Sequence, residues 1–233
     1  MTRDAVGRRA GHATPSAILG RVPDLPFAVP APLRSTVEAA LDREGKLDRA
    51  LDALGPLAGR DVVALDPGAS RAARWTAAGA RLTSIPGGLP TDTRTLADGN
   101  ADVIVSAWSG FRGIDPAELA EADRLLRPNG RLLVIHDYGR DDLATLRGDQ
   151  PEYGAWTRRD GPFLTNGFRV RVIHCFWTFD DLETAGNLVT AAFGDAGRRF
   201  AADLKRPRLS WNVAVYHRSR GGGTWSATRD GET

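Results

Sequence analysis

The chain has 233 residues, a formal net charge of +2 and a pI of about 9.0, and it is long enough for one well-buried α/β domain. It has no apolar run of eighteen residues and no apolar stretch after the N-terminal arginines, so we expect no membrane span, no secretory signal and a cytoplasmic location. The single cysteine, Cys175, excludes an internal disulfide and a cysteine-ligated metal site, and we expect no metal.

The basic residues are almost all arginines, because Lys46 and Lys205 are the only lysines. They form no stripe with interleaved aromatic residues, so a nucleic-acid surface is not indicated. The most basic stretches are the first 21 residues and Lys205-Arg206-Pro207-Arg208, which we interpret as solvated charge. A small-molecule substrate or a protein partner is left as the expected kind of partner.

The first 33 residues are rich in proline and glycine and are expected to form an irregular arm. Residues 34–54 carry leucines and valines at helical spacing, and Gly45 is expected to split them into two short helices. Gly55-Pro56 ends this helical region.

The next stretch predicts a strand, a tight turn and a helix. Val62 to Leu65 is continuously apolar, as expected for a strand that is covered on both faces. Asp66, Pro67 and Gly68 form the turn, and Ser70 is expected to cap a helix over 71–78. Residues 81–85 form a second short strand.

Residues 86–100 are the anomaly of the sequence. A complete doubly wound half would place a helix and a third strand here, and a crossover needs roughly ten to twelve residues for the connection alone. The segment is rich in Gly, Pro, Thr and Asp and has neither helical periodicity nor an apolar run. We therefore expect one helix, and with it one strand, to be missing or reduced to a loop.

The remaining elements alternate as in an α/β domain. Asp115-Pro116-Ala117-Glu118 predicts a capping box at the start of a helix, and Gly194 is expected to end a later one. Strands are expected over 102–107, 132–135, 168–176 and 211–217, a loop with one short helix over 139–167, and a flexible tail over 219–233.

Three stretches together resemble class I S-adenosylmethionine-dependent methyltransferases. Val62 to Ser70 resembles the first motif, Leu96 to Ser106 the turn into the fourth strand, and Glu121 to Ile135 the helix, Pro-x-Gly turn and fifth strand. The resemblance implies an α/β fold with a Rossmann-like, doubly wound sheet. That sheet is mostly parallel, has an antiparallel C-terminal strand, is abridged after the second strand, and lies in a domain over 34–218.

The resemblance also implies an S-adenosylmethionine site at the carboxyl ends of the strands. The candidate cofactor-binding residues are Asp66, Gly68, Ser70, Asp92, Ser106 and Ala107. Three features depart from the family pattern. Ser70 stands where a second glycine is expected, and the second strand ends in Ile85-Pro86-Gly87 without a ribose-binding acid. The helix and strand that flank the adenine in the family are missing from residues 86–100. Asp92 is the nearest carboxylate that could take over that contact.

His136 and Asp137, at the end of the 132–135 strand, are the candidate catalytic residues, because a histidine there could take a proton from an attacking group. Each candidate also has a structural interpretation: Asp66 as a turn residue, Ser70 as a helix cap, Asp92 as a solvated loop acid and His136 as a hydrogen-bonded strand-end residue. The sequence does not decide between the two.

Two functions remain open. Ser106-Ala107-Trp108-Ser109 replaces the Asn/Asp-Pro-Pro-aromatic run of amine methyltransferases, which favours methyl transfer to a small molecule. The alternative is a catalytically inactive relative that binds a partner, since a fold alone does not establish a function. A nicotinamide-dependent oxidoreductase is a third interpretation that the Pro-x-Gly turn disfavours.

Overall fold

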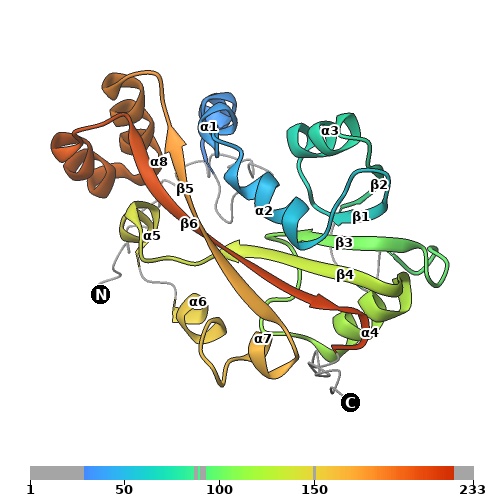
Figure 1. Ribbon diagram of the computed structural model, residues 1–233. Helices are drawn as coiled ribbons and strands as arrows, with labels where there is room; N and C mark the ends of the chain where they lie inside the picture. The colour runs from blue at the N-terminus through green and yellow to red at the C-terminus, as the bar shows by residue number, and fades with distance from the viewer. Residues whose placement is uncertain (1–28, 87–88, 90–92, 149–150, 223–233) are drawn as a thin grey trace, which may run out of the picture.

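The computed structural model describes residues 29–86, 89, 93–148 and 151–222, and it contains one six-stranded sheet covered by helices on both faces (Figure 1). The strand order is β2-β1-β3-β4-β6-β5. β1 (Asp61–Leu65), β2 (Arg81–Ile85), β3 (Ala101–Ala107) and β4 (Leu126–Asp137) are parallel. β6 (Arg208–Ser219) is antiparallel to β4 and to β5 (Arg169–Thr178). The predicted fold class is confirmed.

The side chains of the central strands alternate between two apolar layers, as period-2 geometry requires. Val103 and Val105 of β3 enter the layer beneath α1 (Arg34–Ala40), α2 (Lys46–Leu54), α3 (Ala69–Ala77), α5 (Asp142–Arg147) and α8 (Leu182–Asp203). Ile104 enters the layer beneath α4 (Pro116–Leu125), α6 (Pro151–Trp156) and α7 (Pro162–Thr165), and Ala101 also enters it, because the strand register shifts between Ala101 and Val103. Burial on both faces explains the continuous apolar runs in the sequence.

The sheet is shortened beyond β2, as predicted. The described residues between Ile85 and Ala101 contain no α-helix and no strand. In the doubly wound order a third strand would lie outside the second. β2 is therefore the last strand on its side of the sheet, and most of its residues are exposed.

Some predicted helix boundaries are confirmed and others are wrong. Gly45, with φ of 63°, separates α1 from α2 as expected. Ser70 is not a helix cap, because α3 begins at Ala69, two residues before the predicted start, and Gly68 takes the N-cap position. Residues 139–167 contain α5, α6 and α7 where one short helix was expected, since their apolar residues are too sparse to show periodicity.

The domain boundaries stay a prediction. The described part of the N-terminal side begins with Val29, which is buried, and η1 (Ala31–Leu33). At the other end η3 (Arg220–Gly222) follows β6, and Gly221 N donates to Asp123. Most of the arm and of the tail lies outside the described residues. None of the described helices is long and apolar enough to cross a membrane.

α8 is a helical hairpin rather than one rod. Gly194 has φ 57° and ψ −128°, which breaks the helix where the sequence predicted its end, and a second helical half follows to Asp203. The two halves pack together, because a Cβ on Gly186 would contact Ala201 and a Cβ on Gly197 would overlap the Val189 carbonyl. The hairpin thus depends on the missing side chain at Gly197.

Gly197→Ala is expected to lower the free energy of unfolding by about 1–3 kcal/mol, since overpacking outweighs the gain of roughly 0.5–1 kcal/mol from replacing a helical glycine. Gly186→Ala is the matched control. Its Cβ would lie 3.6 Å from Ala201, an ordinary contact, so the same helix gain should appear without overlap. Urea unfolding of the two variants measures both values, and equal stabilisation by both would contradict the packing described.

Candidate functional site

A pocket of about 370 Å³ lies at the carboxyl ends of β1 and β2, where an open α/β sheet binds its ligands. The turn after β1 and the end of β2 lie next to each other because Leu65 pairs with Ile85 in the parallel ladder. The volume of the pocket is within the range of small-molecule sites, roughly 300–1,000 Å³. It is lined by Asp66, Pro67, Gly68, Ala69, Ala72, Ser84, Ile85 and Pro86.

Gly68 forms the turn between β1 and α3. Its φ of 73° and ψ of 147° lie in a region that glycine adopts without strain. No side chain caps α3, and the first intrahelical bond runs from Ala72 N to Gly68 O at 2.9 Å. The backbone N–H groups of Ala69 and Ser70, in the first turn of α3, therefore have the arrangement of an anion-binding helix N-terminus.

Asp66 is the only ionisable residue among the described residues that line this pocket. It follows β1 with φ of 48°, and its N–H donates to Ile85 O at 3.0 Å, so the turn is fastened to the end of β2. The half-buried residue combines the two interpretations that the sequence left open: it forms the turn, and it lines the pocket. Its contact with a cofactor stays a prediction.

Ser70 faces a different recess. Its hydroxyl accepts a hydrogen bond from Arg74 at 3.0 Å, and it lines a small hollow with Glu38 and Leu41 on the other side of the turn. The side chain that replaces the second glycine of the family motif is exposed and does not narrow the pocket beside Asp66.

Ser106 and Ala107 are buried at the end of β3, and neither lines the pocket. The Ser106 hydroxyl accepts from Gly110 N at 3.1 Å and lies 3.3 Å from the Ser109 hydroxyl. Ser109 in turn donates to Leu65 O at 3.4 Å. This turn after β3 therefore covers the end of β1 on its β3 side, whereas the pocket is lined by the turn after β1, α3 and the end of β2.

The turn after β3 is held in an unusual conformation. Trp108, Phe111 and Ile114 all have positive φ, between 54° and 62°. The Glu118 carboxylate accepts from Phe111 N at 3.0 Å and 3.1 Å, and burial raises the pKa of Glu118 against that bond. Glu118 therefore holds this turn, and its carboxylate also interacts with the backbone N–H of Asp115, the first residue of the predicted capping box. The Asp115 side chain in turn accepts from Ala117 N at 2.8 Å.

Asp137 is buried under the α5 side of the sheet. Its Oδ1 accepts from Trp108 Nε1 at 2.9 Å and from Trp211 Nε1 at 3.2 Å, and the two indoles stack at 5.5 Å. Its Oδ2 lies 2.6 Å from the Arg147 guanidinium. Burial raises the pKa of Asp137, and Arg147 and the two indoles oppose that rise. The carboxylate fixes Trp108 and α5 to the core.

His136 points to the opposite face, because successive strand residues alternate. Its Nε2 lies 3.1 Å from Gly110 O, and its ring packs on Trp156 and Phe163 at 4.8 Å and 6.1 Å between centroids. Burial lowers its pKa to about 3, with Arg112 acting in the same direction. His136 and Asp137 therefore point into opposite layers of the fold, and a catalytic role for either stays a prediction.

The low pKa of His136 predicts a loss of stability in mild acid. The folded state holds the neutral ring down to a pKa of about 3, whereas the unfolded chain takes up a proton below about 6.5. The stabilisation present above pH 6.5 should thus fall by about 2 kcal/mol between pH 7 and pH 5. Urea unfolding at both values measures it, with His136→Gln as control. If wild type and variant lose equal stability, the low pKa is wrong.

Asp92 lies outside the described residues, so its predicted contact stays a prediction. The described end of β2 offers no acid for a ribose; Ser84 and the backbone of Pro86 stand there. The sequence analysis missed Ser84, Ile85 and Ala72 as lining residues. The strand order alone could have indicated the first two, since the end of the second strand must lie beside the turn of the first.

No protein-family model and no curated protein sequence matches this chain. By strand order, the fold is of the class I methyltransferase type. Among solved structures it is similar to geranyl diphosphate methyltransferase in complex with GPP and sinefungin. That match has 13% identity, covers 76% of this chain and 78% of the other, and has a TM-score of 0.41.

It is also similar to a protein of Anaeromyxobacter dehalogenans described provisionally as a type II methyltransferase. Here identity is 19%, coverage is 73% and 95%, and the TM-score is 0.45. A structure titled for the conversion of a disulfide into a thioacetal in echinomycin biosynthesis matches at 14% identity, with coverage of 81% and 85% and a TM-score of 0.47. At these identities and TM-scores the likenesses carry no weight for the chemistry of this chain.

The pocket fits an adenosyl cofactor in part. Gly68 and the uncapped start of α3 suit a carboxylate, and Asp66 suits an ammonium group. The end of β2 supplies a hydroxyl rather than the acid that the family uses for the ribose. Within the described residues, no group of three or more His, Cys, Asp or Glu side chains is placed to hold a metal ion.

Proposed function

We propose that this chain binds S-adenosylmethionine in the pocket between the Asp66–Ala69 turn and the end of β2, and transfers its methyl group to a small molecule. The observation that carries the proposal is the 370 Å³ pocket beside a glycine with φ 73° and the uncapped start of α3. Asp66 would pair with the ammonium of the methionine part, and the amide ends of Ala69 and Ser70 would meet its carboxylate.

Methyl transfer needs an acceptor in line with the sulfonium methyl. The bound group would supply an electrophilic methyl on sulfur, and this chain's residues would act by holding the acceptor in line with it. Asp66, the one ionisable side chain in the described lining, would be engaged by the ammonium group of the cofactor. An acceptor that is already deprotonated, such as a carboxylate or a thiolate, needs no base, so these acceptors are the first to test.

A second candidate is a catalytically inactive protein that keeps the fold and binds a partner. The Ser109 hydroxyl on Leu65 O, and the turn that it belongs to, favour this alternative, because they cover the side of β1 from which an acceptor would approach. The burial of His136 and Asp137 points the same way.

Isothermal titration calorimetry with S-adenosylmethionine and with S-adenosylhomocysteine tests the proposal. Saturable binding of both is expected, and a ligand concentration one hundred times Kd should add about 2.7 kcal/mol to the free energy of unfolding. Absence of binding at millimolar ligand would remove the methyltransferase function and leave the partner-binding alternative. Binding without turnover over a panel of carboxylates and thiols would support inactive cofactor binding.

A further inference from the structure

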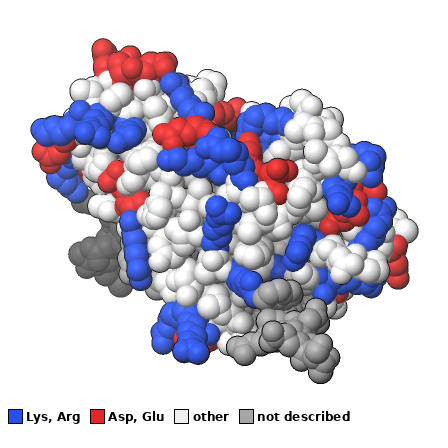
Figure 2. Space-filling model, viewed as in Figure 1, with Lys and Arg blue, Asp and Glu red and all other residues white. Residues whose placement is uncertain are grey.

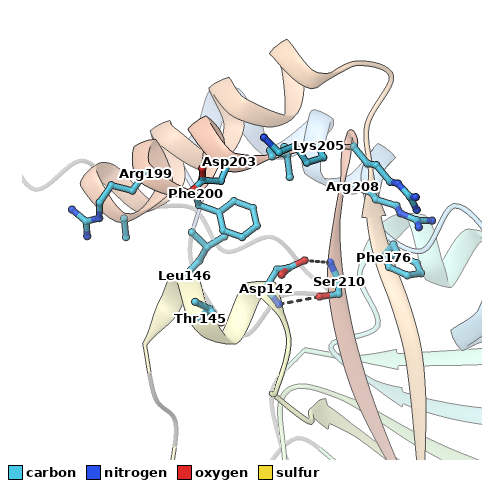
Figure 3. A pocket seen from close by; sticks show the side chains of 13 residues that line it. Asp142, Thr145, Leu146, Phe176, Arg199, Phe200, Asp203, Lys205, Arg208 and Ser210 are labelled. Carbon is cyan, nitrogen blue, oxygen red and sulfur yellow. Dashed lines mark hydrogen bonds between the residues drawn. The ribbon is translucent and has the colours of Figure 1, made fainter.

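A larger cavity, of about 620 Å³, lies between α5, the second half of the α8 hairpin and the paired ends of β5 and β6 (Figure 3). β3 and β4 separate these strands from β1, so about three strand spacings, roughly 14 Å, lie between β1 and β6. The cavity is therefore distinct from the pocket at Asp66. It is lined by Asp142, Thr145, Leu146, Phe176, Ala196, Arg199, Phe200, Asp203, Leu204, Lys205, Arg206, Arg208 and Ser210.

Two apolar side chains, Leu146 and Phe200, form part of the wall of this cavity. Leu146 of α5 is buried, and Phe200 of α8 points its ring into the space next to it (Figure 3). At the floor, Asp142 and Ser210 satisfy each other: Ser210 N donates to Asp142 Oδ2 at 2.7 Å and Asp142 N donates to the Ser210 hydroxyl at 3.0 Å. An apolar body of a ligand can thus lie between the walls without displacing a bonded polar group.

The rim carries an excess of positive charge. The lining contains four cationic side chains but only two carboxylates, those of Asp142 and Asp203. The cations are Arg199, Lys205, Arg206 and Arg208. In the part of the chain that the structure describes, none of the four cations forms an ion pair. Figure 2 shows basic side chains across the centre of this face, and acidic and basic side chains interspersed in its upper part and at both edges.

Two of the cations border the opening. Figure 3 shows Lys205 above the cavity and Arg208 at the side of Phe176, whereas Arg199 points away. The Arg208 guanidinium lies over the Phe176 ring, 4.5 Å from its centroid, so a cation is held on an aromatic face of the lining. Cations after a helix also offset its dipole, and this accounts for Lys205 after α8. It does not account for Arg208, which begins β6, or for the cavity.

We propose that this cavity is a second ligand site, which binds a small organic anion with an aromatic or alkyl body. The body lies between Leu146 and Phe200, and the anionic group meets Lys205 and Arg208 at the rim. The acid at the floor, Asp142, sets the orientation, because it repels an anion that enters head first. The site is independent of the function proposed above.

Three probes with the same apolar body test the site by calorimetry on the full chain: 4-phenylbutyrate, 4-phenylbutan-1-ol and 4-phenylbutylamine. The carboxylate is expected to bind at least about 10-fold more tightly than the alcohol, since it gains charge-assisted hydrogen bonds. The amine should show no binding. Equal binding of the three probes, or no binding of the carboxylate at millimolar concentration, would overturn the proposal.

Variants locate the binding. The double variant Lys205→Gln, Arg208→Gln should weaken 4-phenylbutyrate binding at least about 10-fold, and Ala196→Trp should abolish it by filling the cavity. Arg198→Gln is the matched control, because Arg198 neighbours Arg199 on α8, pairs with Asp195 at 2.8 Å and does not line the cavity. Circular dichroism verifies that each variant is folded. A double variant that binds as well as Arg198→Gln would refute the site.

Discussion

Replacing Asp137 with alanine is expected to lower the free energy of unfolding by about 3–5 kcal/mol, because the change removes one partner of a buried ion pair. The carboxylate is 1% exposed and lies 2.6 Å from an Arg147 guanidinium that is 9% exposed. It also accepts from the indoles of Trp108 and Trp211. The variant would therefore leave a buried guanidinium without its carboxylate and two buried indole N–H groups without their acceptor.

Equilibrium unfolding in urea measures this loss, and two further variants serve as controls. Asp195→Ala removes the carboxylate of a pair with Arg198 whose side chains are 77% and 72% exposed, and it should change stability by less than about 1 kcal/mol. The double variant Asp137→Leu, Arg147→Met removes both charges and should be much less destabilised than Asp137→Ala. A loss below about 1 kcal/mol for Asp137→Ala would show that the cluster is not a structural centre.

The Asp137 cluster has a consequence for function. Trp108, with φ of 54°, follows β3 at the point where the resemblance implies that cofactor and substrate meet. Its hydrogen bond to Asp137 and its stacking on Trp211 bury it in the core instead. The β2 side of the first turn borders a pocket, whereas its β3 side is covered by the turn after β3. Binding of the proposed cofactor and methyl transfer therefore need separate experiments.

The sequence contained most of the architecture because its signals are local. Continuous apolar runs predict the buried strands, and the absence of such a run over 86–100 predicts the shortened sheet. Gly45 and Gly194 each separate two helical segments, and both have the positive φ that glycine adopts readily. The opposite faces of His136 and Asp137 also follow from period-2 geometry, a local rule.

The parts that could not be predicted depend on contacts between distant residues. Glu118 folds back on Phe111, and Asp137 joins Trp108 to Trp211, across 7, 29 and 74 positions of the chain. Neither contact leaves a periodic signal. The α8 hairpin is similar, because Gly197 is an ordinary helical residue until the first half of the hairpin is packed against it.

Blocking the pocket at Asp66 with Ala72→Trp is expected to weaken S-adenosylmethionine binding about 100-fold or more, a change of about 2.7 kcal/mol. Ala72 is a half-buried residue of α3 whose side chain lines the pocket, so an indole there would occupy the volume that a ligand needs. A change at Gly68 is less informative. Its φ of 73° would add backbone strain of order 1–3 kcal/mol to any effect on binding.

Ala73→Trp provides the matched control for Ala72→Trp, because Ala73 is exposed on the same helix and does not line the pocket. Its affinity should stay within about twofold of wild type, since a surface substitution away from the ligand changes free energies by less than about 0.5 kcal/mol. Equal weakening by both variants would indicate a general effect on α3. Unchanged binding in Ala72→Trp would place the ligand elsewhere, and a loss confined to Ala72→Trp would tie cofactor binding to the turn at Asp66 and Gly68.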